Sequence, residues 1–282
     1  MGVGVITGSG TYVLPGIVGG EERLVATEFG AVELTTGRLA GLEVIHVSRH
    51  GDGHPRLSHQ VNHRGNVAAL HELGASCAIG LATCGGVDPS VDPGDLILFD
   101  DLYFPSNRLP DGSACTLHAQ PGAPERAHWM FERPFSEQLR AAVGRAIDAG
   151  RPPRLGGCYG HVDGPRFNTR TEVRALRELG VTAIGQTAGP ETVLCGEAGI
   201  PYALVGYVTG RANGVAPQSM EAMMASIGRS AELFGAVLPE LVVAAAAAGA
   251  ESSGVNHGFE TRPDLYSATS KQVGMPAARS SR

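Results

Sequence analysis

Five clusters of polar residues each follow a short apolar run that has the pattern of a β-strand. The clusters are Thr7-Gly8-Ser9-Gly10, Arg49-His50, Thr83-Cys84-Gly85-Gly86, Gln186-Thr187 and Thr209-Gly210-Arg211. In an open α/β sheet, ligands bind beyond the carboxyl ends of the strands. If these strands belong to one sheet, the five clusters meet at a single site.

The residue types in these clusters suit a tetrahedral oxyanion. Ser9, Thr83 and Thr187 offer hydroxyl groups, and the glycines beside the first two expose backbone N–H groups. Arg49 offers a bidentate guanidinium and His50 a further donor. The pattern is neither a Walker loop nor a dinucleotide-binding fingerprint, because no GxxxxGK[ST] occurs and no GxGxxG follows a strand. We therefore expect a phosphate pocket of another kind.

The elements that must position these residues alternate between strands and helices. Periodicity and end signals predict strands over 3–6, 42–47, 77–82, 96–99, 183–185 and 202–209, a hairpin over 23–36, and helices over 61–73, 135–149, 169–180, 190–198 and 218–238. Thr169 and Glu172 have the spacing of a capping box, and Pro239 is expected to bend or break the last helix. This order predicts a three-layer α/β/α domain with a central mixed, mainly parallel sheet.

One domain is expected over residues 1–250, followed by a polar tail over 251–282 whose last part is disordered. Residues 103–134 have no periodicity and several prolines, which predicts a long functional loop.

Composition excludes several classes of protein. The chain has 282 residues, 43% of them hydrophobic, and a net charge of −6 without a basic stripe, so no nucleic-acid partner is expected. No run of about 18 uncharged apolar residues and no signal peptide occur, which predicts a cytoplasmic protein without a membrane span. The five cysteines are odd in number and form no CxxC, so neither a disulfide framework nor a zinc site is expected. Only Cys84 lies near the predicted site.

The motifs as a set resemble one family. They are Ile6–Gly10, Ser48–His54, Val61–Asn66, Ala82–Gly86, Asp92–Asp95, Asp163–Phe167, Gly185–Thr187 and Pro190-Glu191. In this order, over roughly residues 1–240, they are similar to the methylthioadenosine phosphorylase and trimeric purine nucleoside phosphorylase family. The resemblance implies that phosphate attacks C1′ of a nucleoside and releases a base and a pentose 1-phosphate.

The resemblance also implies roles for individual residues. Phosphate would be held by Ser9, Arg49, His50, Thr83 and Thr187, and Arg49, His50 and Thr187 would be the catalytic set. The nucleoside would be bound by Cys84, Gly85, Phe167, Asn168, Gln186, Gly210, Arg211 and His54, with Phe167 stacked on the base and His54 near the 5′ end of the sugar. No metal and no cofactor are expected, because phosphate is the co-substrate. A homotrimer is implied, with residues 103–134 reaching a neighbour's pocket.

Departures from the family pattern concern the base. Gly210 stands where adenosine-type members carry an aspartate and the 6-oxopurine branch usually has asparagine. Gln186, Asn168 and Arg211 offer amide and guanidinium groups that match an imide edge. We therefore expect a 6-oxopurine or uracil nucleoside, with Gln186→Met lowering turnover of such a substrate.

Several alternatives stay open. The protein could be a methylthioadenosine phosphorylase, a phosphorylase of a 5′-modified uridine, or a relative that binds nucleosides without turnover. Asn168 could only cap a helix, and Arg211 could face solvent. Met220, Met223 and Met224 could meet a 5′ group or belong to the core.

Overall fold

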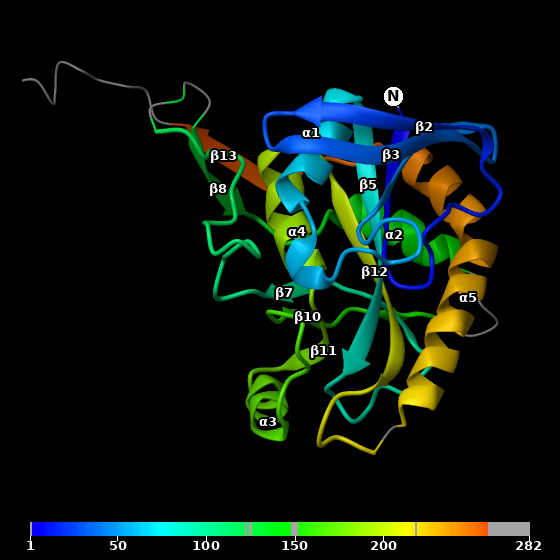
Figure 1. Cartoon of the computed structure of the whole chain (residues 1–282), viewed down its shortest axis with the longest axis vertical. Helices are drawn as coiled ribbons and strands as arrows, with labels where there is room; N and C mark the ends of the chain where they lie inside the picture. The colour runs from blue at the N-terminus through cyan, green and yellow to red at the C-terminus, as the bar shows by residue number, and fades with distance from the viewer. Residues whose placement is uncertain (1, 122, 124–125, 148–151, 218, 259–282) are drawn as a thin grey trace, which may run out of the picture.

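A computed structural model describes residues 2–258, except 122, 124–125, 148–151 and 218. Eleven strands form a mixed, mainly parallel sheet, which confirms the predicted fold class (Figure 1). Its strands are β1 (Gly2–Thr7), β2 (Val18–Thr27), β3 (Gly30–Leu39), β4 (Leu42–Ser48), β5 (Ala75–Gly86), β6 (Leu96–Leu98), β7 (Asp101–Tyr103), β9 (Arg154–Leu155), β10 (Cys158–His161), β11 (Val181–Gly185) and β12 (Tyr202–Arg211).

The long strand β5 joins the two halves of the sheet. It runs parallel to β1 on one side and to β12 on the other, and β1 also pairs in parallel with β4. At its far end, Gly85 and Gly86 pair antiparallel with β11. The carboxyl ends of β1, β4, β5 and β12 therefore lie at one edge of the sheet, beside the end of β11.

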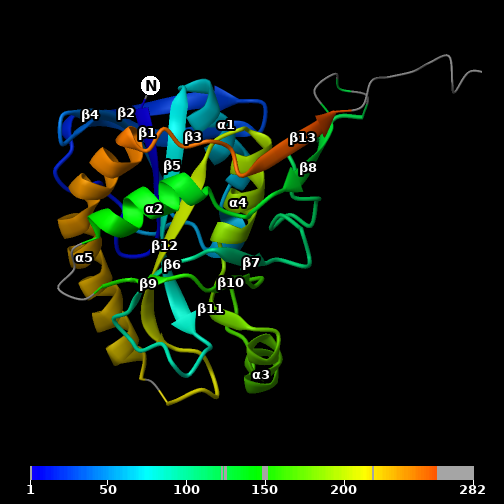
Figure 2. The ribbon, with the colours of Figure 1, turned by 180° about the vertical axis from the view of Figure 1, so that it is seen from behind.

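Helices cover both faces of this sheet. They are α1 (His63–Glu72), α2 (Glu137–Ala146), α3 (Arg170–Glu178), α4 (Ala188–Glu197) and α5 (Met220–Ala247), with a short 3-10 turn, η1 (Ser58–Gln60). One buried cluster includes Val67 and Leu70 of α1 and Leu194 of α4, and a second includes Leu139 of α2 and Leu238 of α5. The views from opposite sides show the same division into layers (Figures 1 and 2).

Five strands were not expected: the short strands β7, β9 and β10 of the main sheet, and the pair β8 and β13. β8 (Ala127–Phe131) lies inside the segment predicted to be irregular, and it pairs antiparallel with β13 (Gly254–Gly258), which lies in the segment predicted to be a tail. The side-chain amide of Asn256 donates to the backbone carbonyl of Glu197 in α4, so the ribbon is tied to the body. The pairing joins segments more than a hundred residues apart, and no local pattern predicts it. Residues 259–282, where disorder was expected, lie outside the described residues.

Two other expectations need correction. α5 continues through Pro239 to Ala247, because residues on both sides of the proline, including Val237, Leu238 and Leu241, are buried against the sheet. Strand β5 extends to Gly86 and β12 to Arg211, so two of the polar clusters lie within strands that pair with each other. The capping box at Thr169 and Glu172 is confirmed.

Helix α5 is also long and apolar enough, by length and composition, to cross a membrane. Phe234, Leu238 and Val242 of this helix are buried in the core cluster that lies against the sheet. This packing accounts for the apolar side of the helix that lies against the sheet, and length and composition alone assign no membrane span.

Candidate active site

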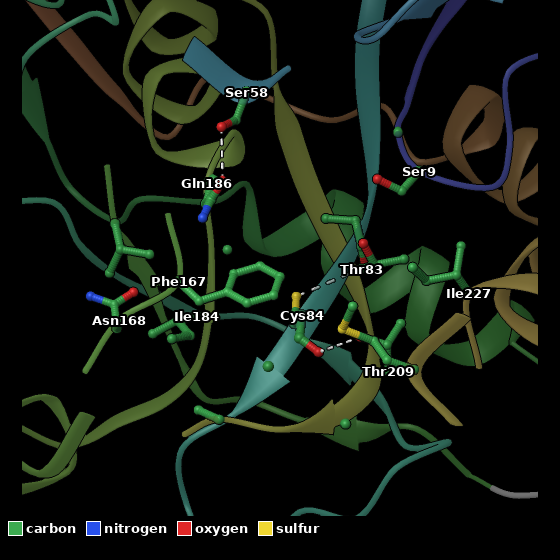
Figure 3. Close-up of a pocket in the computed structure, with 18 of the residues that line it drawn as sticks. Ser9, Ser58, Thr83, Cys84, Phe167, Asn168, Ile184, Gln186, Thr209 and Ile227 are labelled. Carbon is green, nitrogen blue, oxygen red and sulfur yellow. Dashed lines mark hydrogen bonds between the residues drawn. The ribbon is translucent and has the colours of Figure 1, made fainter. Parts of the chain in front are cut away.

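A cavity of about 500 Å³ opens where β1, β4, β5, β11 and β12 end. Figure 3 shows its walls, with Ser9 and Thr83 at one end and Phe167, Asn168 and Ile184 at the other. The structure brings together every residue that the sequence analysis placed in the site: Ser9, Arg49, His50, His54, Thr83, Cys84, Gly85, Phe167, Asn168, Gln186, Thr187, Gly210 and Arg211 all line this cavity. Their individual roles remain predictions.

The Arg49 guanidinium is held in place by the carboxylate of Glu191. Its side chain is 1% exposed, its Nε donates to Glu191 Oε1, and its Nη2 donates to Glu191 Oε2 over 2.7 Å. Nη1 donates to the Leu81 carbonyl oxygen over 2.6 Å. Burial opposes the charge on Arg49, but Glu191 raises the pKa of the guanidinium well above its ordinary value. The two N–H groups that these bonds leave over are the ones Arg49 can offer to a ligand.

Glu191 was quoted in a motif but given no role by the sequence analysis. It is fully buried, and although burial opposes ionisation, Arg49 lowers the pKa of its carboxyl. The Tyr202 hydroxyl also donates to Glu191 Oε2, over 2.9 Å. A Cβ at Gly80 would lie 2.0 Å from the Tyr202 oxygen, so the glycine leaves room for this support. An acid in the first turn of helix 188–197, directly before the apolar run Val193–Cys195, is the signal that could have indicated this role.

Two features of the chain affect access to the end of the cavity that holds Arg49. Thr187 is the N-cap of α4, but its side chain makes no capping bond. Its hydroxyl is therefore available to a ligand in the cavity that Thr187 lines. The first N–H group of the helix, that of Ala188, donates to the Tyr159 hydroxyl over 3.3 Å, and Pro190 has no N–H, so the site does not depend on the end of this helix. Gly8 stands beside Arg49, and a Cβ there would lie 3.0 Å from Arg49 Nη1. The glycine keeps the guanidinium accessible from the cavity.

At the opposite end the cavity offers an apolar surface and an amide. The Phe167 side chain is 61% exposed, and Figure 3 shows its ring pointing into the cavity above Ile184. The backbone carbonyl of Asn168 accepts from Asn213 Nδ2 over 2.8 Å, which fixes its position. Thr169, not Asn168, caps α3. The Asn168 side-chain amide therefore lies in the cavity without a capping role.

Gln186 and Arg211 line the cavity and also form hydrogen bonds within the protein. The Gln186 amide accepts from Ser58 Oγ over 2.8 Å and donates to the Arg166 carbonyl over 3.0 Å. Figure 3 shows this side chain turned toward Ser58. The Arg211 guanidinium donates to Asp92 over 2.6 Å and to the Pro89 carbonyl over 3.0 Å. Both side chains are bonded within the protein, but Gln186 keeps a second amide N–H and Arg211 keeps further N–H groups, so their contacts with a base stay predictions.

The other residues near the site include a buried thiol, a glycine and apolar residues of α5. Burial raises the pKa of Cys84 to about 12, so this thiol is neutral and unreactive. Gly210 is buried and pairs with Gly85, with no side chain facing the cavity. Met220, Met223 and Ile227 of α5 line the cavity, whereas Met224 is 58% exposed and does not. Within the described part of the chain, no group of His, Cys, Asp and Glu side chains could hold a metal ion.

Comparison with known proteins defines the class. A family model described as the phosphorylase superfamily matches residues 3–245, and the chain belongs to this family. A probable 6-oxopurine nucleoside phosphorylase of Thermococcus kodakarensis is 33% identical, over 77% of this chain and 82% of its own length. A probable S-methyl-5′-thioinosine phosphorylase of Xanthomonas campestris is 34% identical, over 84% of this chain and 94% of its own length.

The fold has counterparts of known structure. The methylthioadenosine phosphorylase of Schistosoma mansoni, solved in complex with tubercidin, aligns with a TM-score of 0.73 and 25% identity. The alignment covers 86% of this chain and 91% of the Schistosoma chain. The predicted family is thereby confirmed.

Proposed function

We propose that the protein is a nucleoside phosphorylase that cleaves the N-glycosidic bond of a nucleoside with inorganic phosphate. The observation that carries the proposal is the division of one cavity into two ends. One end combines the anchored guanidinium of Arg49 with the hydroxyls of Ser9, Thr83 and Thr187, and the other presents the exposed ring of Phe167. The first suits an anion and the second a flat base.

The reaction follows from this arrangement. A phosphate oxygen forms a bond to C1′ while the C1′–N bond breaks, and the electron pair of that bond leaves with the base. Positive charge develops on the sugar between the two, and the bound phosphate anion stabilises it. The residues supply position and charge, so no covalent nucleophile, metal or cofactor is needed.

The base is proposed to be a 6-oxopurine or uracil. Without a carboxyl group at Gly210, the departing base must leave as a delocalised anion or be protonated by other means. An anion of an imide-containing base carries negative charge on its carbonyl oxygens, and the Asn168 amide can donate to such an oxygen. A relative named as a 6-oxopurine nucleoside phosphorylase supports this direction.

A second candidate within the family is an S-methyl-5′-thioadenosine phosphorylase. Met220 and Met223 favour it, because they give the sugar end of the cavity an apolar wall suited to a 5′-alkylthio group. The same wall would serve a 5′-modified uridine. A relative that only binds nucleosides is the candidate of another class, and the accessible guanidinium and hydroxyls argue against it.

A substrate panel separates these candidates. The full chain is incubated with phosphate and with adenosine, inosine, guanosine, uridine and their 5′-modified analogues, and the free base is measured. We expect inosine or uridine compounds to be cleaved fastest. Cleavage of methylthioadenosine at least about ten times faster than the corresponding inosine and uridine compounds, roughly 1.4 kcal/mol in the barrier, would establish the second candidate instead.

We also propose a cytoplasmic homotrimer, on the resemblance to the family. Strand β8, with exposed Met130, lies within residues 103–134, the segment expected to reach a neighbouring pocket. Sedimentation that finds a fully active monomer would reject the assembly.

A further inference from the structure

His50 lies beside Arg49 with one ring nitrogen bonded to the protein. Nδ1 lies 2.8 Å from the backbone carbonyl oxygen of Arg56. A carbonyl oxygen can only accept a hydrogen bond, so Nδ1 must carry the proton. In a neutral imidazole the other nitrogen, Nε2, then has a lone pair and no hydrogen.

The surroundings keep the ring neutral. His50 is 6% exposed, and the ring of His54 stacks on it with 4.1 Å between centroids and 10° between planes. Burial lowers the pKa of His50 to about 4, and neighbouring Arg49 and His54 act in the same direction. The Arg56 carbonyl and, more weakly, the Glu191 carboxylate oppose this shift without overcoming it. At neutral pH the ring therefore has one donor, which the protein uses, and one acceptor.

The acceptor faces the place where the anion is proposed to bind. A Cβ at Gly8 would lie 3.8 Å from His50 Nε2 and 3.0 Å from Arg49 Nη1. Both groups therefore border the space next to Gly8. No described residue donates a hydrogen bond to Nε2. An anion seated there meets donors from Arg49 and the hydroxyls, but at His50 it meets an acceptor, contrary to the donor role we expected.

We propose that His50 selects an anion that carries a proton. Hydrogen phosphate and dihydrogen phosphate both have a P–OH group that can donate to Nε2, whereas sulfate at neutral pH has none. An oxygen of sulfate would face the lone pair of Nε2, which leaves a buried acceptor unsatisfied and adds repulsion. The inference rests on the proposed function, and it adds a rule for which oxyanions the site accepts.

The test measures binding of phosphate, arsenate and sulfate to the full chain by calorimetry at pH 7.5. Arsenate resembles phosphate in carrying a proton, and sulfate matches both in shape. We expect arsenate to bind within about threefold of phosphate, and sulfate to bind at least about tenfold more weakly, the size expected for one unsatisfied buried polar group. Binding needs no turnover, so the result does not depend on the identity of the nucleoside.

A variant assigns the selection to His50. His50→Gln places an amide that can rotate to donate, so the preference for phosphate over sulfate is expected to fall to within about threefold. His71→Gln changes an exposed histidine at the end of α1 and is expected to keep the wild-type preference.

Equal binding of sulfate and phosphate to the unmodified protein would overturn the inference while leaving the phosphate site intact. A preference that survives in folded His50→Gln would overturn it as well. No binding of any oxyanion would reject the site itself, and with it the proposed function.

Discussion

Arg49 and Glu191 act as one unit at the scale of single residues. The Glu191 carboxylate is paired with the Arg49 guanidinium, and neither side chain has access to water. Removing Arg49 alone leaves a buried carboxylate without its partner. Such a change typically costs about 3–5 kcal/mol of stability.

We therefore predict that Arg49→Ala lowers both stability and activity, and that the double variant Arg49→Met with Glu191→Gln separates the two effects. The double variant removes both charges at similar volume, so the free energy of unfolding should recover most of the loss. Phosphate-dependent turnover should stay reduced by roughly 10²–10³-fold, the size of one lost charge-stabilising contact. Denaturant unfolding and initial rates measure the two quantities. Recovery of turnover in the double variant would remove Arg49 from the phosphate site.

The absence of a side-chain carboxyl group at Gly210 is predicted to determine which base the enzyme prefers. Gly210→Asp places a carboxyl group where adenosine-type relatives carry one, and it should raise kcat/KM for adenosine relative to inosine by about tenfold or more, roughly 1.4 kcal/mol. Gly210→Asn is the matched control, since its amide has the same size and no charge. It should not favour adenosine. An unchanged ratio in Gly210→Asp would show that the base lies elsewhere.

At the scale of elements, the Gln186 amide ties together loops that follow different strands. Ser58 lies in the segment after β4, Arg166 follows β10, and Gln186 follows β11. The contact is tight, because a Cβ at Gly164 would lie 2.1 Å from Ser58 Oγ and 2.2 Å from Gln186 Oε1. The tie fixes Arg166, and the next residue, Phe167, forms the wall for the base.

Ser58→Ala and Gln186→Met are predicted to have the same consequence. Both changes remove the Ser58–Gln186 hydrogen bond that holds the amide in place, and Gln186→Met also removes the bond to Arg166. KM should therefore rise about three- to tenfold for every nucleoside, with Gln186→Met at the upper end, in line with the roughly 1 kcal/mol of one hydrogen bond. The KM of the double variant should be no higher than that of the less active single variant, because both changes disrupt the same hydrogen-bonded group. Ser90→Ala, at an exposed serine outside the cavity, is the control. If Gln186→Met alone changes the preference between inosine and uridine, Gln186 contacts the base directly.

The elements also show what the sequence could and could not predict. The strands with strong apolar runs and the helix capped by Thr169 could be located, because their signals are local. The polar strand ends predicted which residues meet in one cavity. The β8–β13 pairing and the continuation of α5 through Pro239 could not be predicted, since both depend on contacts between distant segments. For the same reason the bonds that occupy Gln186 and Arg211 were not foreseen.

At the scale of the whole molecule, buried histidines make stability depend on pH. Burial lowers the pKa values of His46 and His63 to about 4 and that of His161 to about 3. Both ring nitrogens of His63 and Nδ1 of His161 are buried without a hydrogen-bond partner. These imidazole rings are therefore neutral in the folded protein at neutral pH.

The sign of the effect follows from linkage. The unfolded chain takes up protons near pH 6.5, before the folded chain does, so this contribution to stability is complete above pH 6.5 and declines as the pH falls toward 4. Each group lowers the free energy of unfolding by up to about 1.4 kcal/mol per pH unit. We predict a steep loss between pH 6.5 and 5, measured by denaturant unfolding. His63→Gln should flatten the profile and exposed His71→Gln should not; a profile that is flat in the unmodified protein would contradict the burial of neutral rings.

The measurement that tests the central claim most directly is the release of base with and without phosphate. The full chain is incubated with inosine and with uridine in phosphate-free buffer and again with added phosphate, and both the free base and the pentose 1-phosphate are determined. The account predicts base release only when phosphate is present, with one pentose 1-phosphate formed for each base. Equal release without phosphate would identify a hydrolase, and binding of the nucleosides without release in either buffer would identify a binding protein; either result would contradict phosphorolysis.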